Sequence, residues 1–236
     1  KFSSNKVKVA LGGDGGDELF GGYDTFKAIK YANLIKYLQL TKLNPALDYL
    51  ISKFPTNYNY MNYKFKLDRF LRYSGKDLAT SNCEWLSPLN QDEISIIFDE
   101  KTSNDELYSE AIDLWHKNNY SNNLDKSLEF YTKIFLQNQI LVKTDRLSMM
   151  NSLEVRSPFL DKDLVECVRK IPAHLKLKGS IGKYILKKTF SKTFGEKFTY
   201  RKKVGFSAPL SKWIINNNID FSVNSKFLKN KKKFIN

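Results

Sequence analysis

The sequence predicts an α/β protein that is predominantly helical, with one short strand leading into a glycine-rich acidic loop. Val7–Leu11 is a short apolar run that breaks at Gly12 and Gly13, which is typical of a buried strand followed by a turn. No second strand is indicated, and a buried strand needs a partner. We therefore expect the end of a Rossmann-like parallel sheet, with earlier strands before Lys1, followed by a helical region.

Apolar residues at helical spacing predict the remaining elements. The clearest pattern begins at Leu128, where Leu128, Tyr131 and Phe135 share one face, and it runs towards Ser148. Further helices are expected over Tyr23–Leu40, Pro45–Ile51, Lys64–Tyr73, Asp161–Arg169 and Lys183–Phe194, the last closed by Gly195. The chain then divides into a strand and loop (1–23), a helical region (24–215) and a basic tail (216–236).

The formal net charge of the 236 residues is +14, which is compatible with a nucleic acid, an anionic membrane surface or a polyanionic substrate as partner. Lysine is spread along the whole chain, and its one dense run is Lys229–Lys233, interrupted by Asn230. This distribution favours a solvated surface over a nucleic-acid groove. Because of this distribution, no nucleic-acid partner is expected. No stretch has the apolar length of a membrane-spanning helix, and no signal peptide leads the chain, so no membrane partner is expected either.

The cysteines and histidines indicate a reducing, cytoplasmic setting. Cys83 and Cys167 lie far apart and form no C-x-x-C pair, so no disulfide framework is expected. His116 and His174 are close in sequence neither to each other nor to a cysteine, which argues against a zinc site.

The first chemically informative block runs from Gly12 to Tyr23 and contains six glycines in its first eleven residues. Glycine lets a backbone turn sharply and approach a ligand closely. Asp14 and Asp17 follow the strand, at the edge where open α/β sheets bind ligands, and carboxylates beside phosphate usually hold Mg²⁺. The block is neither a Walker A loop nor a G-x-G-x-x-G motif. The structural alternative is a glycine-rich turn with acids at a helix start.

The second block carries five charges among apolar neighbours: Asp145, Arg146, Glu154, Arg156 and Asp161. Charges in an apolar context must pair or bind a ligand. A substrate site and a structural ion-pair cluster remain equally open for Glu154 and Arg156.

The third block places Arg201, Lys202 and Lys203 directly before Val204 and Gly205. Three consecutive cations are able to hold a polyanion, with lysine acting as a mobile point charge on phosphate. Taken alone, the block would be interpreted as a solvated basic turn.

Together and in this order, the three blocks resemble the synthetase domain of asparagine synthetases. That family shows G-D-G-G-D-E-L-F-G-G-Y, then D-R-x-S-M…S-L-E-V-R-x-P-F-L-D, then R-x-K-x-G-F-x-x-P, and Lys183–Lys187 matches its K-Y-x-L-[RK] pattern. The resemblance runs from about Val7 to Trp213, is weak between Tyr37 and Asp125, and is absent in the tail. It implies an ATP-pyrophosphatase fold of the adenine nucleotide alpha hydrolase kind.

The resemblance implies that aspartate and ATP form a β-aspartyl-adenylate with release of pyrophosphate, after which ammonia displaces AMP to give asparagine. Asp17 would then bind Mg²⁺, Asp14 would orient the reacting groups, and Lys203 would neutralise the α-phosphate in the transition state. The implied nucleotide-binding residues are Gly13, Gly15, Gly16, Lys183 and Arg201, and the implied substrate-binding residues are Asp145, Arg146, Glu154 and Arg156. The ammonia would come from glutamine in an N-terminal glutaminase domain. A homodimer is left open.

Two parts of the family pattern do not occur in these 236 residues. The pyrophosphate-binding S-G-G-x-D-S loop is missing, and Cys83 and Cys167 are internal, so neither is the N-terminal nucleophile of a glutaminase domain. We therefore expect an N-terminally truncated fragment that shows no ATP–pyrophosphate exchange by itself.

Two other kinds of function remain open. A related amidotransferase would act on another carboxylate, for example in surface-polysaccharide biosynthesis; β-lactam synthetases carry a tyrosine where Asp14 stands, which argues against them. A basic, non-enzymatic nucleic-acid-binding module would explain the net charge but not the acid-rich loop, and its binding would weaken steeply with salt.

Overall fold

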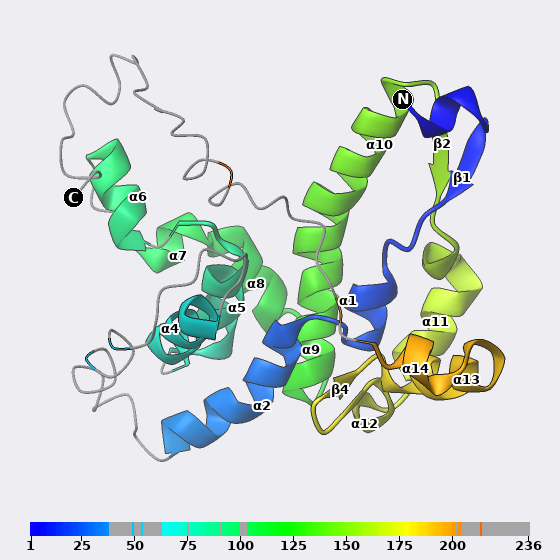
Figure 1. Cartoon of the computed structure of the whole chain (residues 1–236). Helices are drawn as coiled ribbons and strands as arrows, with labels where there is room; N and C mark the ends of the chain where they lie inside the picture. Colours follow the sequence, from blue (N-terminus) through cyan, green and yellow to red (C-terminus); the bar gives the residue numbers. More distant parts are fainter. Residues whose placement is uncertain are drawn as a thin grey trace.

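The computed structural model describes residues 1–37, 49, 53, 63–74, 76–89, 91–99, 103–201, 203 and 213. A long helical rod runs through this part of the chain (Figure 1). It consists of α9 (Asn123–Phe130), a π-helical segment η3 (Tyr131–Leu141) and α10 (Val142–Met149). Helices α2 and α4 to α8 lie on one side of the rod, and the strands β1 and β2 with α11 to α14 lie on the other (Figure 1).

The remaining element bounds complete this arrangement. The helices on the first side are α2 (Asp24–Tyr37), α4 (Tyr63–Tyr73), α5 (Leu78–Leu86), α6 (Gln91–Phe98), α7 (Asn104–Leu107) and α8 (Ser109–His116). The others are α1 (Gly16–Phe20), α11 (Lys162–Lys170), α12 (Ala173–Lys176), α13 (Tyr184–Phe194) and α14 (Glu196–Thr199), with 3-10 turns η1 (Ser3–Asn5) and η4 (Pro158–Leu160). A short antiparallel hairpin joins β3 (Leu177–Lys178) to β4 (Ile181–Gly182).

The strand at the start of the chain has a partner within the chain. Strand β1 (Val9–Leu11) pairs in parallel with β2 (Glu154–Arg156), with Ala10 opposite Val155. The expectation of a strand without a partner in these residues was therefore wrong. The expectation of a buried strand was also wrong, because Leu11 is 75% exposed. Strand β2 escaped prediction because a strand of three residues with charged ends shows no apolar pattern.

A large aromatic core joins the rod to the helices on the first side. Phe26 and Tyr73 pack there with residues of the rod, and Leu128 and Tyr131 are both buried, as the helical periodicity predicts. The rings of Phe26 and Tyr131 lie with their centroids 4.7 Å apart. This core fixes α2, which begins directly after the block Gly12–Tyr23, against the rod.

A smaller core lies on the other side of that loop. Leu19 and Phe20 of α1 pack with Val168 of α11, and the edge of the Phe159 ring meets Phe20 at a centroid distance of 6.0 Å. Helix α1 also packs against α9 and η3. The short α1 is thereby held between both cores, which gives the loop a rigid support.

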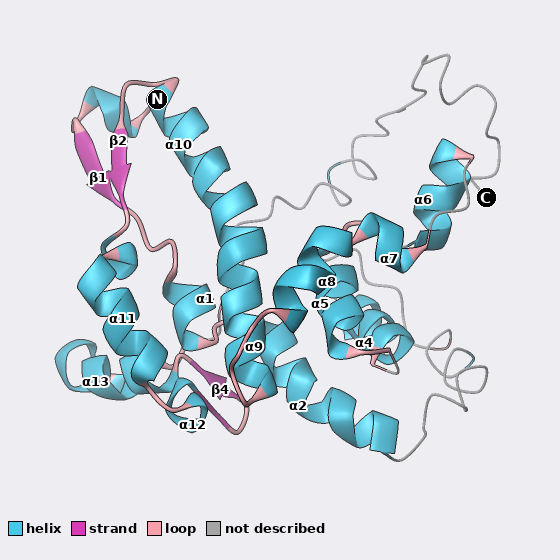
Figure 2. Cartoon of the chain, turned by 180° about the vertical axis from the view of Figure 1, so that it is seen from behind, coloured by secondary structure: helices cyan, strands magenta, loops and turns pink. Residues whose placement is uncertain are grey.

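The described residues confirm a mostly helical protein with a small parallel sheet (Figure 2). The predicted helices beginning at Tyr23, Lys64, Leu128, Asp161 and Lys183 correspond to α2, α4, the rod, α11 and α13. The helix predicted over Pro45–Ile51, the end of Tyr23–Leu40 and the basic tail lie outside the described residues. No helix in the described ranges is both long and apolar enough to cross a bilayer.

Candidate functional site

Two backbone features shape the glycine-rich loop between β1 and α1. The N–H of Gly12 donates to the carbonyl of Arg156 at 2.7 Å, so the strand pairing continues into the loop. Gly15 has a φ of +88°, and a Cβ there would lie 2.3 Å from Leu160 Cδ2. Both the left-handed backbone and the close packing therefore require glycine at this turn. The turn ends at the first residue of α1 and sets the direction in which Asp17 projects.

Asp17 is the centre of the candidate site. Its Oδ1 atom lies 3.0 Å from the Nζ of Lys183 and 2.8 Å from the Nζ of Lys203. The carboxylate is partly buried, while Lys203 is half-exposed. The structure thus brings together residues from the first block, the third block and the K-Y-x-L-K segment.

Gly22 provides the space for this contact. A Cβ at position 22 would lie 1.8 Å from Asp17 Oδ1 and 2.4 Å from Lys183 Cε. The N–H of Gly22 also donates to the backbone carbonyl of Asp17 at 2.8 Å, which folds the end of α1 back over its start. A side chain at Gly22 would separate the carboxylate from its lysine.

Lys183 is held in place by its backbone. Its N–H donates to the carbonyl of Phe20 at 3.0 Å, and its φ of +55° turns the chain from β4 into α13. The preceding residue, Gly182, lies so close to Gly21 that a Cβ would come within 2.3 Å of the Gly21 carbonyl oxygen. The start of α13 is therefore fixed against the end of α1.

Lys187 follows Lys183 by one turn of α13 and is partly buried. Burial, followed by repulsion from Lys27 and Lys183, lowers the pKa of Lys187.

Glu18 and Tyr23 form a second pair beside Asp17. The hydroxyl of Tyr23 donates to Glu18 Oε1 at 2.5 Å, and Glu18 is only 2% exposed. Burial raises the pKa of the Glu18 carboxyl, although the bond from Tyr23 opposes this change. Burial and the nearby Glu18 carboxylate raise the pKa of the Tyr23 hydroxyl, which therefore stays protonated. Sequence reasoning assigned no role to either residue, although both belong to the first block.

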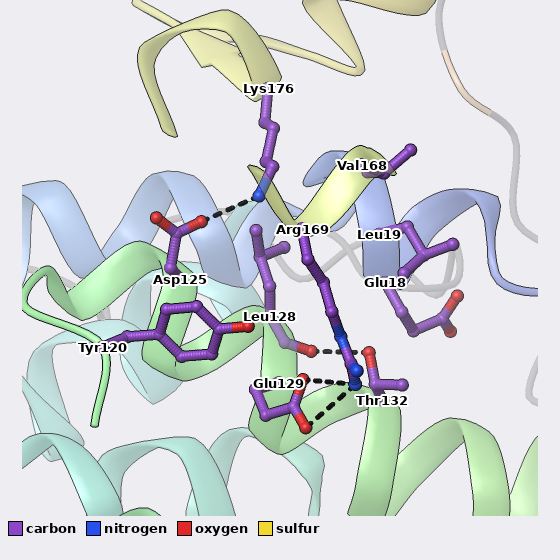
Figure 3. Close-up of a pocket in the computed structure, with 10 residues that line it drawn as sticks. All are labelled: Glu18, Leu19, Tyr120, Asp125, Leu128, Glu129, Thr132, Val168, Arg169 and Lys176. Carbon is purple, nitrogen blue, oxygen red and sulfur yellow. Dashed lines mark hydrogen bonds and ion pairs between the residues drawn. The ribbon is translucent and has the colours of Figure 1, made fainter. Parts of the chain in front are cut away.

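Glu18 also faces a small cavity (Figure 3). The cavity measures about 20 Å³, which is enough for one water molecule. Two ion pairs line it: Lys176 to Asp125 at 2.9 Å, and Arg169 to Glu129 at 2.9 Å. Its lining includes neither Asp17 nor the two lysines, so we regard it as part of the packing between α1, α9, α11 and α12.

The other predicted residues of the loop and the third block lie in varied surroundings. Asp14 is in the turn before α1 and forms no ion pair with a described residue. Gly13 is exposed, and a Cβ there would have no neighbour within 4 Å. A Cβ on Gly16 would lie 3.6 Å from Lys183 Nζ, so Gly16 borders the Asp17 site. Arg201 packs its guanidinium over the ring of Phe198 at 4.1 Å.

The charges of the second block are not buried, contrary to the expectation that they stand in an apolar context. All five are exposed: Asp145, Arg146, Glu154, Arg156 and Asp161. Glu154 pairs with Arg156 at 2.7 Å along β2, and Asp161 caps α11 by accepting from the N–H of Leu164 at 3.1 Å. Their apolar neighbours in sequence do not cover these charges, because Leu147 is 57% exposed and Met150 is 80% exposed. Their predicted role in binding substrate remains untested.

Asp17 fits the needs of a magnesium ion that arrives with a nucleotide. No group of three or more His, Cys, Asp and Glu side chains in the described part of the chain is arranged to hold a metal alone. Mg²⁺ needs no such group, because it commonly takes one or two carboxylates together with phosphate oxygens. The Asp17 oxygen that two ammonium groups now approach is already a cation site.

A carboxylate set between lysines at the start of a helix, directly after a glycine-rich loop, defines a site suited to a phosphate chain and its accompanying cation. The chain matches the family model described as asparagine synthase over residues 1–233, and it belongs to that family. No solved structure matches it significantly.

Curated relatives are similar at modest identity. Asparagine synthetase (glutamine-hydrolyzing) 1 of Bacillus subtilis (strain 168) is 28% identical over 92% of this chain and 33% of its own length. A putative asparagine synthetase (glutamine-hydrolyzing) of Mycobacterium tuberculosis (strain ATCC 25618 / H37Rv) is 27% identical over 88% of this chain and 31% of its length. Amidase chyE of Penicillium rubens is 28% identical over 84% of this chain and 30% of its length. The chain thus spans about a third of these relatives.

Proposed function

We propose that this chain takes part in the ATP-dependent amidation of aspartate to asparagine, through a β-aspartyl-adenylate. The observation that carries this proposal is the meeting of Lys183 and Lys203 at one oxygen of Asp17. Asp17 and Lys203 are 186 positions apart, so their contact is a product of the fold and not of local sequence. Membership of the asparagine synthase family supports the same reaction.

The proposed chemistry follows from the charges at the site. An oxygen of the aspartate β-carboxylate attacks the α-phosphorus of ATP, and the bond to pyrophosphate breaks. Negative charge grows on the α-phosphate and on the leaving group, and Lys203 and Lys183 are placed to stabilise it. Ammonia then attacks the acyl carbon, loses a proton, and AMP leaves with the former carboxylate oxygen.

The other residues have supporting roles in this proposal. Asp17 would hold Mg²⁺, which supplies charge neutralisation on the phosphates when bound. Asp14, at the exit of β1, would orient the reacting groups, and the backbone around Gly13, Gly15 and Gly16 would approach the nucleotide. Arg201 would add positive charge, and Asp145, Arg146, Glu154 and Arg156 would contact the acceptor. These assignments rest on the family motifs.

We further propose the partners that the family implies. Ammonia would be supplied by glutamine hydrolysis in a glutaminase domain, and the protein would act in the cytoplasm. Strands β1 and β2 would belong to a larger parallel sheet of the nucleotide-binding kind, which the exposed Leu11 supports. Because these 236 residues contain no S-G-G-x-D-S loop, we expect no ATP–pyrophosphate exchange from them alone.

The test is aspartate-dependent ATP–pyrophosphate exchange in the complete product of the gene. Lys203→Ala should lower the exchange rate about 10²- to 10³-fold, the usual effect of removing one preorganised group that stabilises transition-state charge. Lys117→Ala, on the exposed end of α8, is the matched control and should exchange normally. Equal rates for wild type and Lys203→Ala would contradict the role of Lys203.

Two observations also support a different acceptor. A relative that is 28% identical is named an amidase. The exposed Glu154 and Arg156 pair with each other, so the structure does not commit either side chain to binding aspartate. Exchange should therefore be compared between aspartate and a panel of other carboxylic acids. A faster rate with another acid would move the proposal to a related amidotransferase.

A further inference from the structure

Lys203 touches two groups, and only one of them is charged. Its Nζ atom lies 2.8 Å from Asp17 Oδ1 and 4.3 Å from the centroid of the Tyr23 ring. The face of an aromatic ring attracts an ammonium ion through its quadrupole. The Tyr23 ring thus makes a second contact that positions Lys203, independent of the carboxylate.

Other cations compete with Lys203 for the Asp17 carboxylate. Asp17 Oδ1 is shared with Lys183, and the same oxygen is the one proposed to bind a cation. A cation at Asp17 would repel both ammonium groups. The ring face carries no such competition, so it continues to hold Lys203 when Asp17 is otherwise engaged.

The Tyr23 ring is itself firmly fixed. It packs among Phe26, Tyr131 and Phe135, each with a centroid distance of 5.8 Å. Its hydroxyl donates to Glu18 Oε1 at the opposite end of the side chain. A ring that is packed on its sides and anchored at its tip presents one face in a defined position.

Glu18 connects this ring to the rest of the site. It is the residue after Asp17 in α1, and its carboxyl group is buried with the Tyr23 hydroxyl as its bonding partner. The anchor of the ring and the carboxylate that contacts Lys203 therefore stand on the same turn of helix. The helix backbone therefore fixes the spacing between Asp17 and Glu18.

We propose that Tyr23, anchored by Glu18, is a positioning residue that holds the Lys203 ammonium in place for the adenylation step. This inference rests on the proposed function of Lys203. Tyr23 does not touch the reacting atoms; it restricts where Lys203 can go.

The kinetic test compares Tyr23→Leu, which removes the ring, with Tyr23→Phe, which keeps it. Tyr23→Leu should lower kcat for aspartate-dependent exchange roughly five- to thirtyfold, the loss of one cation–π contact, with little change in KM for ATP or aspartate. Tyr23→Phe should lose less activity than Tyr23→Leu, because the ring face remains and only the bond to Glu18 is lost. Tyr31→Leu is the matched control, because Tyr31 lies exposed on α2, the helix that begins directly after Tyr23, and it should behave as wild type.

A spectroscopic test reports the contact itself. In protein labelled with ¹³C-lysine, the ε-methylene protons of Lys203 should be shifted upfield by the ring current of Tyr23, and Lys203→Ala assigns the signal. The shift should persist in Tyr23→Phe and Tyr31→Leu and vanish in Tyr23→Leu. A merely structural role of Tyr23 in the aromatic core would not produce this shift.

The outcomes separate the inference from the proposed function. A wild-type protein without an upfield Lys203 signal overturns the inference, even where Tyr23→Leu fails to fold. A folded Tyr23→Leu variant with the wild-type kcat also overturns it. Suppose instead that the Lys203 signal is shifted upfield but the protein shows no ATP–pyrophosphate exchange with any carboxylate. That result would overturn the proposed function, while the contact between Lys203 and Tyr23 would still hold.

Discussion

At the scale of single residues, the site depends on how closely side chains approach one oxygen atom. Asp17 Oδ1 accepts two ammonium groups within 3.0 Å, and the free space that permits this is the missing side chain of Gly22. The six glycines of the first block look alike in the sequence, yet their roles differ. Gly15 is needed for its backbone angle, and Gly22 is needed for the space above Asp17.

This distinction predicts the effect of Gly22→Ala. The added methyl group would displace Asp17 from Lys183, so exchange activity in the complete gene product should fall at least tenfold, beyond any loss of stability. Gly179→Ala is a suitable control, because Gly179 has a φ of +60° and open space around it. That control should lose about 1 kcal/mol of stability from backbone strain and keep its activity when folded.

The measurement is the exchange rate per folded molecule, with thermal unfolding as the check on folding. If Gly22→Ala and Gly179→Ala lost activity only in proportion to their unfolded fraction, the close approach at Gly22 would have no functional role.

At the scale of elements, the periodicity of apolar residues predicted those helices that have one buried face and one solvent-exposed face. Helices α2, α4, α11 and α13 and the rod follow the expected positions because each carries an apolar stripe. Helix α5 gives no such signal, since Ala79 to Trp85 are all buried and its polar residues are buried together with its apolar ones. Burial on all sides is a property of the assembled fold, and so it could not be inferred from the local sequence.

Two elements are joined by an ion pair that could not be predicted from the local sequence. Lys176 of α12 and Asp125 of α9 lie 51 positions apart, and both side chains are nearly buried. Removing one partner of a buried pair leaves the other charge without compensation. Asp125→Asn should therefore lower the free energy of unfolding by about 3–5 kcal/mol.

The control for this prediction is Asp113→Asn, which breaks the exposed pair between Asp113 and Lys117 on α8. An exposed pair of this kind contributes about 0.3–0.5 kcal/mol at most. Chemical denaturation of both variants gives the comparison. Equal losses for Asp125→Asn and Asp113→Asn would show that the α9–α12 contact is not a stabilising pair.

At the scale of the whole molecule, the fold brings together blocks that the sequence keeps apart. The resemblance implied roles at one active site for Asp17, Lys183 and Lys203, and the fold brings these three side chains into contact, while their roles stay a prediction. The tyrosine face that holds Lys203 could not be predicted, because it depends on the packing of Tyr23 against the rod. The exposure of the second block was likewise beyond prediction, since apolar neighbours in sequence suggest burial, whereas Leu147 and Met150 beside these charges are exposed as well.

The central claim is that the protein activates the β-carboxylate of aspartate by forming an adenylate. The most direct measurement uses aspartate labelled with ¹⁸O in that carboxylate, supplied with ATP and glutamine to the complete gene product. Adenylation followed by attack of ammonia must transfer one labelled oxygen to AMP, so we predict ¹⁸O-labelled AMP in equal amount to asparagine. Asparagine formed with unlabelled AMP, or AMP released without any dependence on aspartate, would contradict the account.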